Sequence, residues 1–126
     1  MRALTIAAVL QLTACTAATP VPDPSATADA FRDCLDSERI AGQRAEGPTT
    51  IVFETAGGRW RNTLPEACPG LDRPSSLITL VFEPKTGPLC RNDFVRAVDS
   101  NQLGTLGANA FPRCRLGRFT RIPSRP

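Results

Sequence analysis

Four cysteines have the number and spacing for covalent cross-linking. They are 34, 22 and 24 residues apart, whereas four-cysteine zinc sites normally use pairs separated by only about two to four residues. The fifth cysteine, Cys15, belongs to a separate N-terminal segment, and if it is set aside the remaining number is even. An even number of cysteines is typical of disulfides in exported chains, whose compartments keep such bridges oxidised. The sequence therefore predicts two disulfides and no metal site. The residues concerned are Cys34, Cys68, Cys90 and Cys114.

The pairing of these cysteines has three solutions. Loop closure assigns each bridge about 3–4.5 kcal/mol, so the differences between the solutions are too small to choose among them. We favour Cys34 with Cys114, because the two ends of a closed sheet commonly meet. Cys68 then pairs with Cys90, since a strand and a turn between them return the chain. The other two pairings stay open.

The absence of histidine and tyrosine restricts catalysis. It excludes Ser/His and Cys/His nucleophiles, imidazole bases and histidine zinc sites. What remains is a hydrolase with two carboxylates facing each other across a cleft. Carboxylates scattered over a small domain are usually solvated, so we expect a non-catalytic protein without a cofactor. The carboxylates considered are Glu54, Glu66, Glu83, Asp93 and Asp99.

Two sets of polar residues are candidates for binding. Arg61, Asn62 and Asp93 could form a polar site, although Asn62 could instead bond the neighbouring backbone. The second set consists of C-terminal arginines interleaved with Phe111 and Phe119, and it is suited to phosphates of lipopolysaccharide or phospholipid headgroups. The alternative is a solvated edge strand followed by a basic tail. These arginines are Arg113, Arg115, Arg118, Arg121 and Arg125, with Arg115 and Arg118 as the main candidates.

The overall charge gives no sign of a nucleic-acid partner. Fourteen arginines, one lysine and twelve carboxylates leave a formal charge of +3 at pH 7. Nucleic-acid binding requires a concentrated basic face that displaces counterions from phosphates. This near balance argues against it.

The elements that position these residues begin with a hairpin. Strand-like runs at 49–56 and 59–64 flank two glycines, and a two-residue turn at Gly57-Gly58 is typical of hairpins. That turn places Thr55 opposite Trp60, Phe53 opposite Asn62, Ile51 opposite Leu64 and Glu54 opposite Arg61. One face is then mostly apolar, and the other carries a solvated Glu54–Arg61 ion pair.

Further strands are expected along the rest of the chain. Residues 37–45 form a first strand, 76–83 an apolar central strand, 93–98 a strand or helical turn, and 114–122 a last strand, with a loop around residues 104–107. A short helix, capped by Thr27, covers residues 28–35. Short runs between Gly/Pro turns predict a mainly β fold. We expect a small antiparallel barrel or sandwich of about five or six strands, with the short N-terminal helix and two disulfides.

The N-terminal sequence predicts export and a cellular location. Residues 1–14 have a charged start and an apolar run too short to span a bilayer. Leu12-Thr13-Ala14-Cys15 resembles the bacterial lipobox, which implies cleavage before Cys15 and its acylation. The alternative is an ordinary secretory leader ending near Ala18. Residues 15–28 are a Pro/Ala/Thr-rich tether, 29–123 the domain and 124–126 a tail. We expect a lipid-anchored, periplasm-facing protein, and Thr16 favours the outer over the inner membrane.

Several separated motifs resemble one family. They are Arg-Asn-x-Leu-Pro at 61–65, Cys-Pro-Gly-Leu at 68–71 and Cys-x-Leu-Gly-x-Phe at 114–119, with shorter matches at 34–35, 39–40 and 89–90. Together they resemble a family of small exported bacterial proteins of unknown function, often lipoproteins. The resemblance implies an exported, cysteine-bridged domain and supplies no activity.

These observations favour a non-catalytic envelope lipoprotein that presents one face to a cell-wall component or a protein partner. One alternative is an inhibitor of a wall-cleaving enzyme, since periplasmic lysozyme inhibitors can be small, disulfide-bearing, lipid-anchored barrels. Their recognition motif is absent from this sequence. A second alternative is a module that binds anionic lipid or lipopolysaccharide, and a carboxylate hydrolase is the least favoured.

Overall fold

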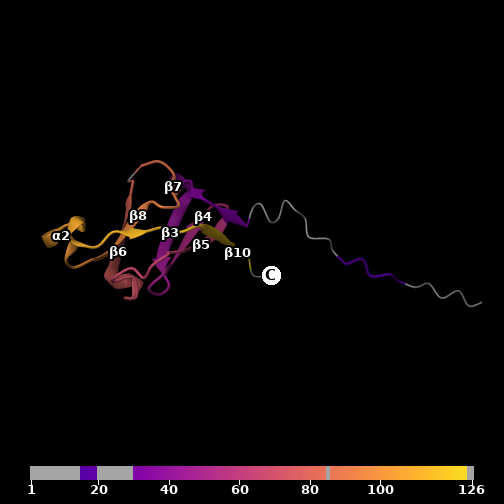
Figure 1. The fold of residues 1–126 in the computed structure, drawn as a ribbon, viewed down its shortest axis with the longest axis horizontal. Coiled ribbons are helices and arrows are strands. Elements are labelled where there is room, and N and C mark those ends of the chain that lie inside the picture. Colours follow the sequence, from indigo (N-terminus) through magenta and orange to yellow (C-terminus); the bar gives the residue numbers. More distant parts are fainter. Residues whose placement is uncertain (1–14, 20–29, 85, 125–126) are drawn as a thin grey trace, which may run out of the picture.

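The structure is a computed structural model that describes residues 15–19, 30–84 and 86–124. The predicted leader, most of the tether, the start of the predicted helix and Arg125 lie outside the described residues. Figure 1 shows the strands of the domain gathered into one body, with α2 (Leu103–Leu106) at the end away from β10 (Phe119–Ile122). In the part of the chain that is described, no helix has the length and apolarity to cross a membrane.

The largest sheet has five antiparallel strands in the order β1-β10-β5-β4-β3. Strands β4 and β5 form the hairpin, and Ile51, Phe53 and Trp60 turn their side chains into the core. The bounds of the remaining strands are Phe31–Arg32 for β1, Ile40–Ala45 for β3, Thr50–Thr55 for β4 and Gly58–Thr63 for β5.

Two smaller antiparallel sheets complete the fold. One has the order β6-β8-β9 and the other pairs β2 with β7. Their bounds are Ile78–Glu83 for β6, Phe94–Asp99 for β8, Cys114–Arg115 for β9, Cys34–Leu35 for β2 and Leu89–Cys90 for β7. Short 3-10 helices occur at Ser37–Arg39, Ser75–Leu77 and Ala108–Ala110. The mainly β prediction is confirmed, but no closed barrel is present among the described residues.

The core joins the five-stranded sheet to the three-stranded one. The ring of Phe53 lies 5.6 Å from that of Phe82 on β6 and 5.5 Å from that of Phe119 on β10, measured between centroids. Val95 and Leu116 are fully buried beside them. Tilted and edge-on aromatic contacts of this kind favour packing beyond the area that they bury.

The hairpin is present, but its register differs from the predicted one by two residues. The turn is Ala56-Gly57, so Phe53 lies opposite Trp60 and Glu54 opposite Arg59. The Thr55 hydroxyl donates to the Gly58 carbonyl at 2.8 Å, which closes this turn one residue earlier than predicted. Because side chains alternate along a strand, a shift of two leaves each on its predicted face. The apolar face is therefore right, and the expected pairing of Glu54 with Arg61 is wrong.

Several other elements differ from prediction. A 3-10 helix occupies Ser37–Arg39 at the start of the predicted first strand, and α2 occupies part of the loop expected around residues 104–107. The expected N-terminal helix is replaced within residues 31–35 by β1 and β2, because their backbones pair with β10 and β7. The apolar run at 76–83 is an edge strand, since β8 and not β6 is central in its sheet. The predicted last strand divides into β9 and β10, because residues 116–118 cross from one sheet to the other.

The two disulfides are present, but the favoured pairing is wrong. The bridges are Cys34–Cys90 and Cys68–Cys114, with Cα–Cα distances of 3.9 and 5.7 Å. The pairing of β2 with β7 sets Cys34 directly opposite Cys90. The ends of the domain are joined through backbone pairing of β1 with β10 instead.

Candidate functional site

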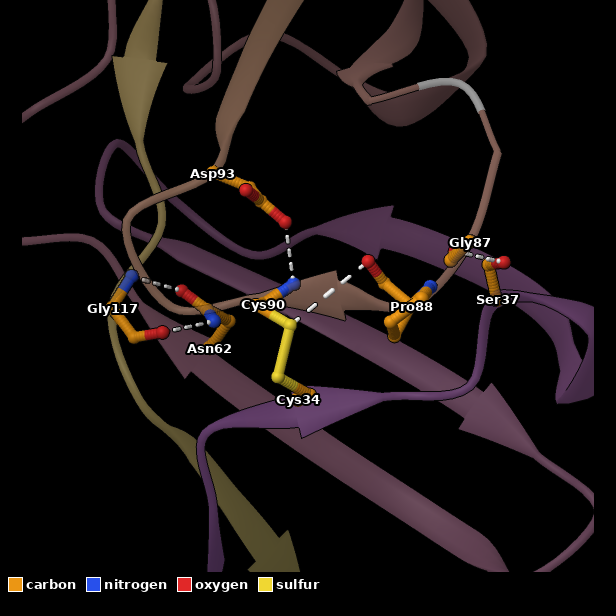
Figure 2. The surroundings of a disulfide bond; sticks show 8 residues. All are labelled: Cys34, Ser37, Asn62, Gly87, Pro88, Cys90, Asp93 and Gly117. Atoms are coloured by element: carbon orange, nitrogen blue, oxygen red, sulfur yellow. Dashed lines mark hydrogen bonds between the residues drawn. A yellow bond between two sulfur atoms is a disulfide. The ribbon is translucent and has the colours of Figure 1, made fainter.

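Asn62 has a structural role, but its partner is the backbone of the distant Gly117 and not the neighbouring backbone that the sequence suggested. Its side chain is completely buried. Oδ1 accepts a hydrogen bond from the Gly117 N–H, and Nδ2 donates one to the Gly117 carbonyl, both at 2.8 Å (Figure 2). A buried amide is stable only when its polar atoms are paired. Asn62 therefore fixes the segment that crosses between the sheets, and we name this pair of bonds the Asn62 clasp.

Glycine is the only residue type that fits at position 117. A Cβ atom there would lie 2.0 Å from the Thr63 carbonyl oxygen, far inside van der Waals contact. The close approach of two backbones therefore requires glycine. It also brings the Gly117 N–H and carbonyl within reach of the amide of Asn62, on the strand that ends at Thr63.

Asp93 braces the same segment from the other side. Its Oδ2 accepts from the Cys90 N–H at 2.6 Å, as Figure 2 shows. Its carbonyl accepts from the Leu116 N–H at 2.8 Å, and the Asn92 N–H donates to the Leu116 carbonyl at 3.0 Å. The predicted site of Arg61, Asn62 and Asp93 is thus not assembled. Arg61 is exposed and, as the next residue on the strand, points to the face opposite Asn62.

Two neighbouring hollows lie beside the braced segment. The first, of about 520 Å³, is named the arginine hollow, because three arginines and no aspartate or glutamate line it. The second, of about 740 Å³, is named the proline hollow, and it shares Pro65 and Arg115 with the first. The arginine hollow is lined by Thr63, Pro65, Arg91, Asn92, Arg115, Leu116, Gly117 and Arg118, and the proline hollow by Pro65, Glu66, Ala67, Pro69, Phe94, Arg113, Cys114 and Arg115.

Ion pairs leave much of this positive charge uncompensated. Arg118 Nε lies 3.3 Å from an Asp33 carboxylate oxygen, and both side chains are more than half exposed. Within residues 15–19, 30–84 and 86–124, neither Arg91 nor Arg115 makes an ion pair. Exposed pairs such as Arg118–Asp33 are weak and exchange readily with other partners. The arginine hollow therefore carries about two free positive charges and a third that is loosely held.

In the proline hollow the cations lie against an aromatic ring. The Arg113 guanidinium carbon is 3.8 Å from the Phe94 ring centroid, and that of Arg115 is 5.6 Å from it. Arg113 also pairs with Glu83 at 3.1 Å. A cation over a ring face is attracted by the ring quadrupole and is held in a defined direction.

The backbone next to each arginine of the arginine hollow is fixed by a disulfide or by a pair of hydrogen bonds. Arg91 directly follows Cys90, and Arg115 directly follows Cys114, so each is adjacent to a disulfide. Arg118 directly follows Gly117 in the Asn62 clasp. The Arg91 N–H also donates to the Asp33 carbonyl at 2.6 Å. The side chains remain exposed while the chain that carries them is fixed.

The structure brings together only part of the predicted arginine surface. Arg113, Arg115 and Arg118 line the hollows, whereas Arg121 donates to the Gly57 carbonyl at 2.9 Å and lies over Trp60. Of the two predicted aromatic residues, Phe119 is fully buried in the core. The Phe111 carbonyl accepts from Arg96, and its N–H donates to the Ala108 carbonyl at 3.1 Å. Arg91 was missed, and its only sequence signal was its place after a cysteine whose partner was assigned wrongly.

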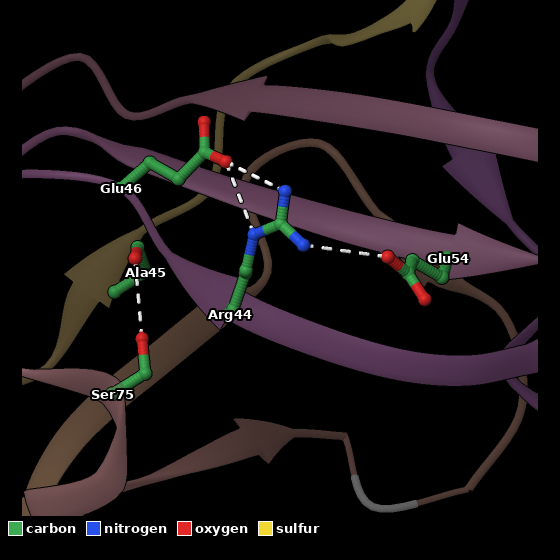
Figure 3. A network of polar contacts seen from close by, with 5 residues as sticks. All are labelled: Arg44, Ala45, Glu46, Glu54 and Ser75. Atoms are coloured by element: carbon green, nitrogen blue, oxygen red, sulfur yellow. Dashed lines mark hydrogen bonds and ion pairs between the residues drawn. The ribbon is translucent and has the colours of Figure 1, made fainter. Parts of the chain in front are cut away.

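Four of the five predicted carboxylates have partners in arginine side chains or backbone. Glu54 pairs with Arg44 at 3.4 Å, in a network that includes Glu46 (Figure 3). Asp99 pairs with Arg73 at 2.6 Å. Glu83 pairs with Arg96 at 3.3 Å and with Arg113, Asp93 binds backbone, and Glu66 lines the proline hollow.

Comparisons of the chain with family models, with curated proteins and with solved structures find no match. The family resemblance of the three motifs therefore stays a prediction. The geometry of the two hollows is the basis for a functional proposal.

Proposed function

We propose that the chain is a lipid-anchored protein of the cell envelope whose domain binds its ligand, without catalysis, at the arginine and proline hollows. In this proposal residues 1–14 are a leader, and Cys15 is acylated and becomes the N-terminus. Two or three acyl chains give stable anchoring where one does not. The domain faces the periplasm, with the outer membrane favoured.

The tether sets how far the binding face can be from the membrane. Its proline-rich composition favours the extended polyproline form, at ~3.1 Å per residue. The thirteen residues from Thr16 to Ala28 can then place the domain up to roughly 40 Å from the lipid. This range allows contact with the bilayer surface and with components just beyond it.

The observation that carries the binding role is the lining of the arginine hollow. Three arginines line one concave surface with no aspartate or glutamate among the lining residues, and clefts lined by one sign of charge attract ligands of the opposite sign. The backbone that carries these arginines is held by disulfides and hydrogen bonds, which favours a preformed binding site over a flexible surface. Four of the five candidate carboxylates of a hydrolase are instead engaged by arginines or backbone: Glu54, Glu83, Asp93 and Asp99.

The test is site-specific photo-crosslinking of the full acylated chain in envelopes of its native host. A photo-reactive amino acid replaces Thr63, which lines the arginine hollow, or Thr105, which is also exposed but lies on α2. We expect an adduct from position 63 that is lost in the Arg115→Gln background, and none from position 105. Equal adducts from both positions, or none from either, would refute binding at this face.

The same samples test the anchor and the class of partner. Mass spectrometry should find an acylated Cys15 at the N-terminus, and an unmodified Met1 would contradict the envelope address. An adduct with a wall-cleaving enzyme would favour the inhibitor alternative over binding of a lipid or glycan. A shift of lipid or glycan mass would favour the latter.

A further inference from the structure

We infer that the arginine hollow is a site for a phosphomonoester group, bound by the guanidinium groups of Arg91, Arg115 and Arg118. The inference rests on the proposed function, because it names the ligand chemistry of the same face. It goes beyond that function by committing to a charge state and a set of contacts.

The charge of the hollow matches a phosphomonoester. Arg91 and Arg115 have no ion-pair partner in the described part of the chain, and the exposed Asp33 holds Arg118 through one contact at 3.3 Å. A phosphomonoester carries about −1.5 to −2 at pH 7, with three acceptor oxygens. Two free guanidiniums balance that charge, and the third supplies donors for the remaining oxygen. A diester or a carboxylate carries one charge and leaves the hollow positive.

The donor chemistry also suits phosphate. A guanidinium presents its N–H groups in a planar fork that bonds two oxygens at once. Three forks around one hollow supply more donors than a planar carboxylate can accept, whereas the tetrahedral oxygens of phosphate point in separate directions. Recognition by three arginines therefore favours phosphate over carboxylate.

The size of the face indicates that the phosphate is carried on a larger molecule. The arginine hollow, at about 520 Å³, and the proline hollow, at about 740 Å³, lie side by side and share Arg115. Each is within the range of about 300–1,000 Å³ that is usual for small-molecule sites. Pro65, Pro69 and Phe94 give the proline hollow an apolar surface beside its charged residues, and this mixed lining suits a carrier with both polar and apolar groups. The phosphate chemistry is common to a glycan, a lipid headgroup and the free ion.

Preorganisation supports the site. Binding costs free energy whenever loops must be ordered, and that cost is small where the backbone is already fixed. Here the two disulfides and the Asn62 clasp hold the residue next to each of the three arginines. Only the side chains are left to order on binding.

The test is calorimetric titration of the purified mature chain, acylated and in non-ionic detergent. The probes are glycerol 3-phosphate, its matched diester glycerophosphoglycerol, acetate, glucose 1-phosphate and inorganic phosphate. We expect the monoester to bind at least tenfold tighter than the diester and acetate. If glucose 1-phosphate binds most tightly, the natural phosphate is carried on a glycan. If glycerol 3-phosphate binds most tightly, it is carried on a lipid headgroup, and if inorganic phosphate does, the ligand is the free ion. Each of these results supports the phosphate site.

The variants separate a built site from diffuse charge. Arg91→Gln and Arg115→Gln should each weaken monoester binding by about tenfold or more, because each removes a charge-assisted contact. The monoester affinity of Arg115→Lys should lie between those of the parent and of Arg115→Gln, since lysine keeps the charge but lacks the planar fork of N–H donors. Arg61→Gln is the matched control, because Arg61 is exposed and lies outside both hollows. All these side chains are exposed, so unchanged melting temperatures verify the fold.

Two results would overturn the inference. One is equal binding of all anions with the same loss in Arg61→Gln, which indicates diffuse attraction. The other is no binding of any phosphate probe while position 63 still crosslinks in envelopes. In that second case the proposed function survives and its ligand is not a phosphate. If position 63 does not crosslink and no phosphate probe binds, both the proposed function and the phosphate site are refuted.

Discussion

The Asn62 clasp makes the stability of the domain depend on one buried amide. Asn62→Ala leaves the Gly117 N–H and carbonyl without their 2.8 Å partners. An unsatisfied buried polar group costs about 1–3 kcal/mol. Gly117 is only partly buried, so water compensates in part, and we expect a loss of about 2–4 kcal/mol in the free energy of unfolding. For a domain of this size that is about 10–30 °C in melting temperature.

Asn62→Asp gives the sharper result because its shape is nearly unchanged. The new carboxylate still accepts from the Gly117 N–H, but its second oxygen faces the Gly117 carbonyl, and burial raises its pKa. The protonated form donates to that carbonyl and restores the clasp. Below the ordinary aspartate pKa of about 3.9, folded and unfolded chains are both protonated and the penalty is absent. The penalty grows as the pH rises from there through the raised folded pKa.

The assay is urea denaturation with both disulfides oxidised, at pH 4 and pH 7. The Asn62→Asp variant should be closer to the parent in stability at pH 4 than at pH 7. The stability loss of Asn62→Ala relative to the parent should be the same at both pH values. Arg61→Ala, one residue away and exposed, should change stability by only about 0.5 kcal/mol. A loss below about 1 kcal/mol for Asn62→Ala, or a parent-like pH profile for Asn62→Asp, would refute the clasp.

Two further predictions concern the same framework. Gly117→Ala should lower the free energy of unfolding by about 1–3 kcal/mol or more, because its Cβ would meet the Thr63 carbonyl at 2.0 Å. Gly104→Ala, with open space around it, is the control and should be neutral or stabilising in thermal melts. The Cys68→Ser/Cys114→Ser variant should lose about 4 kcal/mol, from the 46-residue loop that the bridge closes. Peptide mapping of the unreduced parent should recover this pair, and a Cys68–Cys90 peptide would contradict the structure.

Sequence patterns predicted the faces of the hairpin better than its register. Alternation alone decides which side chains turn inward, so Phe53, Trp60 and Asn62 were assigned to the buried side correctly. The register depends on whether the turn begins at Ala56 or at Gly57, and both leave two residues in the turn. Nothing in the local composition separates these choices, because a shift of two preserves the pattern.

Long-range features were beyond the reach of the sequence. Loop-closure energies for the bridges that form differ little, with separations of 56 and 46 residues, so the pairing of Cys34 with Cys90 depends on a strand contact that only the fold shows. The place of Arg91 in the lining of the arginine hollow follows from that same contact. The apolar run of β6 indicated a strand but not its edge position, because neighbours in a sheet are not encoded locally.

The role of the arginine hollow can be observed directly by NMR of the mature chain, acylated, in detergent and labelled with ¹⁵N-arginine. Glycerol 3-phosphate is titrated while the side-chain Nε–Hε signals are followed. Saturable shifts at Arg91, Arg115 and Arg118, with Arg59 and Arg61 unchanged, are the predicted result. Equal shifts at all arginines, or none at these three, would contradict binding in the hollow.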